Sequence, residues 1–159
     1  MTSKNGHLEV VKLLLDKGAN VSCQNKWKQT LLHCVSKHGH LEVAKLLLEK
    51  GADVNCQDIF HWTPFHYASS NGHLRMAELL LQKGANVNFQ NLRKQTPLHI
   101  AVRYCKKEIV KLLFDYGCDI NLKDEHGKTA DNIAVSEGFH DIVELISQKR
   151  MESLSLNQT

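Results

Sequence analysis

The chain has 159 residues, of which 42% are hydrophobic and 23% charged, values typical of a single globular domain with a buried core. The formal net charge of +3, in a chain with 17 acidic residues, is too small to indicate nucleic-acid binding by itself. No segment approaches the roughly 18 consecutive apolar residues that a membrane span needs, and the first residues lack the apolar stretch of a signal peptide.

The five cysteines indicate a reducing compartment. Their number is odd and they form no CxxC pair, which argues against both a disulfide framework and a structural zinc site. Reduced thiols are typical of proteins in the cytoplasm or nucleus. We therefore expect an intracellular protein, either cytoplasmic or nuclear.

One sequence pattern returns along the chain every 33 residues. It begins at Gly6 as GHLEVVKLLLDKGANV, at Gly39 as GHLEVAKLLLEKGADV and at Gly72 as GHLRMAELLLQKGANV. A degraded copy, CKKEIVKLLFDYGCDI, begins at Cys105, and a shortened copy, GFHDIVELISQK, begins at Gly138. The leucines and valines of each copy have helical spacing, and the glycine that follows them in the first four copies is typical of a helix end.

A second series with the same interval precedes each later copy. It consists of the threonines in TLLH, TPFH, TPLH and TADN, namely Thr30, Thr63, Thr96 and Thr129. Threonine is a natural N-cap, and His33, His66 and His99 stand three residues later, where a side chain can reach back to the cap. Each unit is therefore predicted to contain a short first helix, a longer second helix and a polar loop before the next threonine.

These residues resemble the ankyrin repeat, whose pattern T-P-L-H-x-A, G-H and V-V-x-L-L-L-x-x-G-A-x-V-N they follow at the same period. The resemblance implies an all-α repeat solenoid of helix–loop–helix units with projecting β-hairpin-like fingers. It covers one domain, residues 1–150, followed by a flexible tail at residues 151–159. The expected units are 1–24, a partial unit entered inside its first helix, then 25–57, 58–90, 91–123 and the C-terminal cap 124–150.

The fourth copy of the pattern departs from the others at its start. Cys105 stands where the others have glycine. If the turn keeps its shape, this residue adopts a positive φ, at a cost of roughly 1 kcal/mol.

The histidines do not form a predicted metal site. Six of the ten occupy repeated framework positions, and those of the TPLH series form a column on neighbouring helices. Packed helices stand about 8–10 Å apart, whereas zinc ligands lie about 2 Å from the metal, so neighbours in this column cannot share one ion. We expect no metal, no cofactor and no catalytic constellation.

The residues that vary between units, while the framework stays fixed, are the predicted contact surface. They lie at the finger tips and at the ends of the first helices, and aromatic side chains among them are flanked by lysine and arginine. The alternative is that each tryptophan packs on its own finger. The predicted partner-binding residues are Trp27, Lys28, Phe60, His61, Trp62, Arg93, Lys94, Arg103 and Tyr104.

The leading functional hypothesis is a non-catalytic protein–protein interaction module. A partner protein or peptide with an apolar anchor and acidic flanks would dock on the concave face formed by fingers and first helices, and we expect a monomer that binds neither nucleic acid nor membrane. One alternative is a small anionic or nucleotide ligand, held by stacking on Trp27 or Trp62 and by Lys28 and Lys94. Another is that the chain is a targeting segment of a larger multidomain protein.

Overall fold

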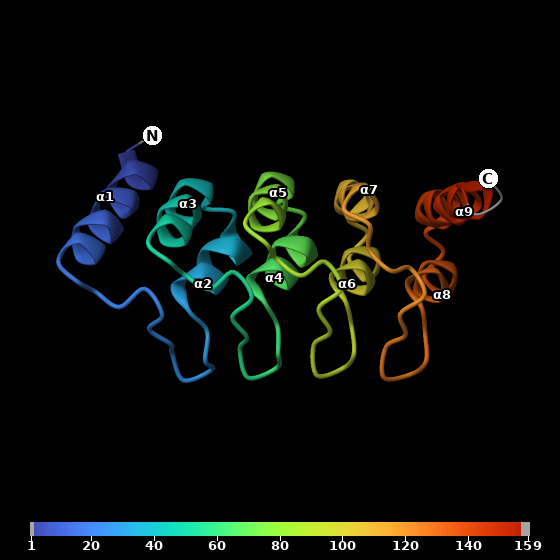
Figure 1. Cartoon of the computed structure of the whole chain (residues 1–159), viewed down its shortest axis with the longest axis horizontal. Helices are drawn as coiled ribbons and strands as arrows, with labels where there is room; N and C mark the ends of the chain where they lie inside the picture. Colours follow the sequence, from blue (N-terminus) through green and yellow to red (C-terminus); the bar gives the residue numbers. More distant parts are fainter. Residues whose placement is uncertain (1, 157–159) are drawn as a thin grey trace.

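The computed structural model of the protein describes residues 2–156, which form nine helices and no β-strand (Figure 1). The helices are α1 (Thr2–Asp16), α2 (Leu31–His38), α3 (Leu41–Glu49), α4 (Pro64–Asn71), α5 (Leu74–Gln82), α6 (Pro97–Arg103), α7 (Lys107–Asp115), α8 (Ala130–Ser136) and α9 (His140–Leu156).

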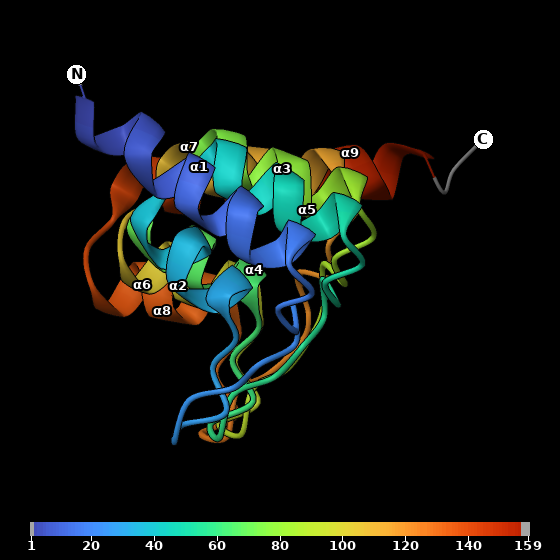
Figure 2. The same cartoon turned by 90° about the vertical axis from the view of Figure 1, so that its left-hand side faces the viewer.

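The helices lie in two stacked rows (Figures 1 and 2). In the first-helix row α2, α4, α6 and α8 pack each on the next, and in the second-helix row α1, α3, α5, α7 and α9 do the same. The loops between units project from the side of the first-helix row as a line of fingers (Figure 2). The all-α repeat solenoid predicted from the sequence is confirmed.

The core is one continuous apolar column between the two rows. Its centre is one leucine or isoleucine from each of α3, α5, α7 and α9, spaced by the repeat interval, and all four are fully buried: Leu47, Leu80, Leu113 and Ile146. Alanines such as Ala44 and Ala77 let neighbouring helices approach closely, and their exposure is nil. Each unit therefore needs its neighbours to complete the burial of its apolar face, as repeat proteins do.

The histidines of the TPLH series join each unit to the next. The backbone N–H of Thr30, Thr63 or Thr96 donates to Nδ1 of the histidine three residues later, at 3.0, 3.2 and 3.2 Å. Nε2 of the same ring lies 3.0–3.2 Å from a carbonyl oxygen at the base of the following finger. The predicted capping role of these histidines is confirmed, and both ring nitrogens are occupied by it.

The N-terminal unit differs from the sequence prediction. Residues 2–16 form the single helix α1, which runs through Gly6, whereas the prediction placed the end of a first helix before that glycine. Gly39 and Gly72 end α2 and α4 with a φ of 72°. An uninterrupted helix at Gly6 keeps the backbone hydrogen bonds that such a turn would break.

The C-terminal unit carries polar residues where the inner units are apolar. Asp131 stands at the position of Leu32, Phe65 and Leu98 and pairs with Arg150 at 3.2 Å. Ser147, at the position of Leu48, Leu81 and Phe114 in the inner units, is exposed. The helix α9 continues to Leu156, so residues 151–156 of the predicted tail are helical and exposed where described, and residues 157–159 lie outside the described part.

Candidate functional site

Each finger is held at its base by an asparagine or aspartate. These residues recur at the repeat interval and are Asn25, Asp58, Asn91 and Asp124. In every case Oδ1 accepts hydrogen bonds from the backbone N–H groups two and four residues further on, at 2.8–3.0 Å. This series was not predicted, although its 33-residue spacing was a usable signal. The fingers are therefore rigid loops.

The finger tips share one backbone conformation. The third residue after each base has a positive φ: 57° at Lys28, 57° at His61, 53° at Lys94 and 72° at Gly127. Neighbouring tips are joined by single backbone hydrogen bonds of 3.0, 3.1 and 2.9 Å, of which the first runs from Ile59 N–H to the Trp27 carbonyl. The four fingers thus form one continuous strip rather than independent loops.

Trp62 lies at the base of its finger rather than at the tip. Its ring is half-buried against the rings of Tyr67 and His66, at centroid distances of 5.0 and 5.7 Å. The Tyr67 hydroxyl donates to Asp58 Oδ2 at 2.7 Å and accepts from Gln29 at 2.9 Å. Burial, with the hydrogen bond to Asp58, raises the pKa of Tyr67, so this hydroxyl stays protonated. The tryptophan is therefore held on a fixed aromatic surface.

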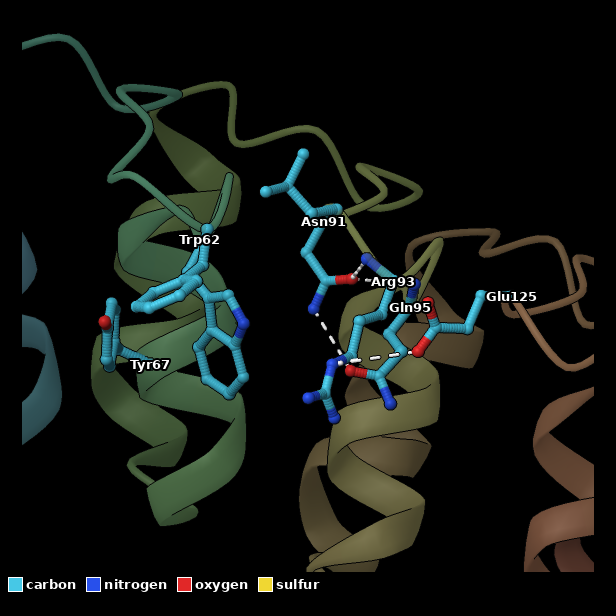
Figure 3. Close-up of a pocket in the computed structure, with 8 residues that line it drawn as sticks. Trp62, Tyr67, Asn91, Arg93, Gln95 and Glu125 are labelled. Carbon is cyan, nitrogen blue, oxygen red and sulfur yellow. Dashed lines mark hydrogen bonds and ion pairs between the residues drawn. The ribbon is translucent and has the colours of Figure 1, made fainter.

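A pocket of about 480 Å³ opens between the second and third fingers (Figure 3). Its aromatic wall comes from the second finger and α4, and its polar wall from the third and fourth fingers (Figure 3). The lining residues are Phe60, Trp62, Tyr67, Asn91, Leu92, Arg93, Gln95 and Glu125.

The structure brings together three of the nine predicted site residues in this pocket, namely Phe60, Trp62 and Arg93. The other six lie outside its lining: the exposed tip residues Trp27, Lys28, His61 and Lys94, and, at the end of α6, Arg103 and Tyr104. The exposed Trp27 ring carries the Lys26 ammonium 4.3 Å from its centroid.

Five lining residues are not among the nine predicted site residues: Tyr67, Asn91, Leu92, Gln95 and Glu125. Leu92, Gln95 and Glu125 are nevertheless finger residues that differ between units, and so belong to the variable positions from which the contact surface was predicted. The sequence holds no such signal for Tyr67, because the role of this residue depends on its contacts with Trp62 and Asp58.

The close pair of Cys56 and His33 is not arranged for nucleophilic chemistry. Cys56 Sγ lies 3.7 Å from His33 Nδ1 and 3.4 Å from the Thr30 hydroxyl. Burial raises the pKa of Cys56 to about 11, so the thiol stays protonated at neutral pH. Since the thiolate is the reactive form, this cysteine is a packing residue.

The described residues offer neither a metal cluster nor a membrane span. No three histidine, cysteine, aspartate or glutamate side chains in that part of the chain converge to hold an ion. No described helix is both long and apolar enough to cross a bilayer.

Stacked helix pairs with a rigid strip of fingers define an α-helical repeat protein that presents an extended surface. The family model for ankyrin repeats, in three copies, matches residues 1–91 and again residues 84–157. The chain belongs to the ankyrin-repeat family. It matches none of the curated proteins with which it was compared. Ankyrin repeats generally mediate protein–protein interaction and are typically non-catalytic.

Proposed function

We propose that the protein is a non-catalytic module that binds a partner protein on the face formed by its fingers and first helices. The observation that carries the proposal is a pair of exposed apolar side chains beside the pocket. Phe60 is 57% exposed and Leu92 is 56% exposed, on neighbouring fingers that a backbone hydrogen bond joins. Exposed apolar residues around a rigid pocket are typical anchors of an interface.

The charges on the same face favour a partner with acidic flanks. Exposed basic side chains on it include Lys26, Lys28, Arg93, Lys94 and Arg103. The exposed acidic side chains on this face include Glu137 at the end of α8 and Glu125, which is a loose partner of Arg93 at 3.7 Å. Exposed charges of this kind mainly set association rate and salt sensitivity, while the apolar anchors supply most of the affinity.

Leu92→Ala tests the proposal. Removing this side chain should weaken partner capture, by 1 kcal/mol or more if it is an anchor, because truncation of an interface anchor typically costs that much. Helical circular dichroism should not change, because the side chain is exposed. The measurement is binding of the partners that the wild-type protein recovers from cell extract.

Leu154→Ala is the matched control, since Leu154 is also 56% exposed but lies near the end of α9. Equal capture by wild type and both variants would reject the finger face as the binding surface. Trp62→Ala is a weaker test, because the ring packs on Tyr67 and its loss can disturb the finger itself.

A small planar anionic ligand, such as a nucleotide, is the second candidate. The observation that favours it is the Trp62 ring opposite Arg93 across the pocket (Figure 3). A stacked base would quench the fluorescence of Trp62 and raise the melting temperature. A nucleotide titration that leaves both unchanged would remove this candidate.

The compartment is also a proposal. All five cysteines are unpaired, and three of them, Cys23, Cys34 and Cys105, are exposed. Exposed thiols persist in reducing surroundings. We infer that the protein works inside the cell, in the cytoplasm or nucleus.

A further inference from the structure

The pocket between the second and third fingers contains hydrogen-bond donors without acceptors. Trp62 Nε1 and Gln95 Nε2 make no hydrogen bond to another residue in the part of the chain that the structure describes, and both are open to solvent. The Arg93 guanidinium has one ion pair in that part of the chain, from Nε to Glu125 Oε1 at 3.7 Å, and is largely exposed. The indole ring of Trp62 faces Arg93 and Gln95 across the pocket (Figure 3).

The acceptors beside these donors are already occupied. Asn91 Oδ1 accepts from the backbone N–H groups of Arg93 and Gln95, both at 2.9 Å. These two bonds fix the orientation of the Asn91 amide, so its Nδ2 donates to Gln95 Oε1 at 3.2 Å. The Gln95 amide is thereby oriented too, and its Nε2 is the donor that remains. Asp58 Oδ2 is taken by Tyr67.

The charge of the lining selects among anionic groups. Arg93 is its one cation and Glu125 its one anion. A phosphate monoester carries a charge near −2 and is held best by several cations. A carboxylate carries one charge, matches the guanidinium fork and can take Glu125's place there. Because the Arg93–Glu125 pair is exposed, little stability is lost when it opens.

We propose that this pocket binds the carboxylate of an acidic side chain in the partner, with an adjacent apolar side chain resting on Phe60 and Leu92. Arg93 pairs with the carboxylate, and the indole N–H of Trp62 and the amide of Gln95 donate to its oxygens. This inference rests on the proposed function and names the chemistry that the finger face recognises.

The test uses a capped tripeptide with glutamate between two phenylalanines, titrated into the full ¹⁵N-labelled chain. The indole N–H signal of Trp62 and the side-chain amide signals of Gln95 should shift on binding. The signal of the exposed Trp27, assigned by its loss in Trp27→Phe, should move little. The same peptide with glutamine in place of glutamate should bind at least about tenfold more weakly, since it lacks a charge-assisted hydrogen bond.

Two substitutions in the pocket should act in opposite directions. Arg93→Gln should weaken binding of the glutamate peptide about tenfold. Glu125→Gln should strengthen binding of the same peptide, because this substitution removes the competing carboxylate. Arg103→Gln is the matched control, since this arginine is exposed outside the pocket. Neither pocket side chain is buried, so circular dichroism should be unchanged in all three variants.

Four outcomes would overturn the assignment: equal binding of glutamate and glutamine peptides, no effect of Arg93→Gln, weaker binding in Glu125→Gln, or tighter binding of a phosphoserine peptide. If one of these occurs while Leu92→Ala still reduces partner capture, the proposed function stands and the carboxylate site is wrong. If Leu92→Ala also leaves partner capture unchanged, the proposed function and the carboxylate site are both wrong.

Discussion

The backbone of Cys105 has a conformation that is unfavourable for any residue with a side chain. Its φ is 53°, in the left-handed region that glycine adopts at the equivalent Gly39, Gly72 and Gly138. The conformation predicted from the sequence is confirmed. The stacked neighbours impose the turn, and the cysteine bears a cost of roughly 1 kcal/mol.

Cys105→Gly should therefore stabilise the protein. The relief of roughly 1 kcal/mol is partly offset by the larger entropy of glycine in the unfolded chain, so a net gain of about 0.5 kcal/mol or less and a small rise in melting temperature are expected. Cys34→Gly, inside α2, is the matched control and should lower the melting temperature. A lower value for Cys105→Gly as well would contradict the strain argument.

Residues of the framework could be predicted from the sequence because they repeat, and residues of the pocket mostly could not. The threonine caps and their histidines recur at one interval with one role. Trp62, in contrast, packs on Tyr67, which stands where other units have Cys34 and Ile100. A contact between two residues that each occur once has no periodic signal, so the sequence placed Trp62 at the finger tip.

The helix α1 lies at the N-terminal end of the second-helix row, so its outer face has no neighbour in the described part of the chain. Leu14 on this helix is 55% exposed, whereas the equivalent Leu47 on α3 is 1% exposed. A hollow of about 650 Å³ lies between α1, α2 and α3. The length of α1 was not predicted, because the repeat pattern indicates a turn at Gly6 and only the packing decides whether one forms.

This difference in burial predicts different costs for the same substitution. Leu47→Ala should lower the free energy of unfolding by about 2–5 kcal/mol, because it leaves a cavity in the core. Leu14→Ala should cost about 1 kcal/mol or less, since the side chain is already half in water. Urea unfolding followed by circular dichroism measures both. Equal costs would mean that the outer face of α1 is covered in solution, for example by a second molecule.

At the scale of the whole molecule, the histidine column links unit to unit and requires neutral rings. Nδ1 of each ring accepts from a threonine N–H, so Nε2 must carry the proton that it donates to the next finger. Burial lowers the pKa of His33, His66 and His99, and that of His66 falls to about 4. A proton on Nδ1 would face another donor and break the link.

The stability of the stack should consequently fall in acid. Above the unfolded-state pKa of about 6.5, neither state binds a proton at these rings and they add no pH dependence. Between about pH 6.5 and 4 the histidine rings bind protons in the unfolded chain but stay neutral in the native structure. The free energy of unfolding therefore decreases as pH falls. Each buried histidine contributes up to about 1.4 kcal/mol per pH unit within its window. Urea midpoints at pH 7.5, 6 and 5 measure this slope.

His66→Gln separates this effect from general acid destabilisation. The variant should be less stable than wild type at pH 7.5, because the link to the third finger is weakened, but its stability should decline less steeply towards pH 5. His61→Gln is the control, since His61 is exposed at a finger tip, and it should keep the wild-type slope. If His66→Gln keeps the wild-type slope, carboxylates rather than the histidine column cause the loss of stability in acid.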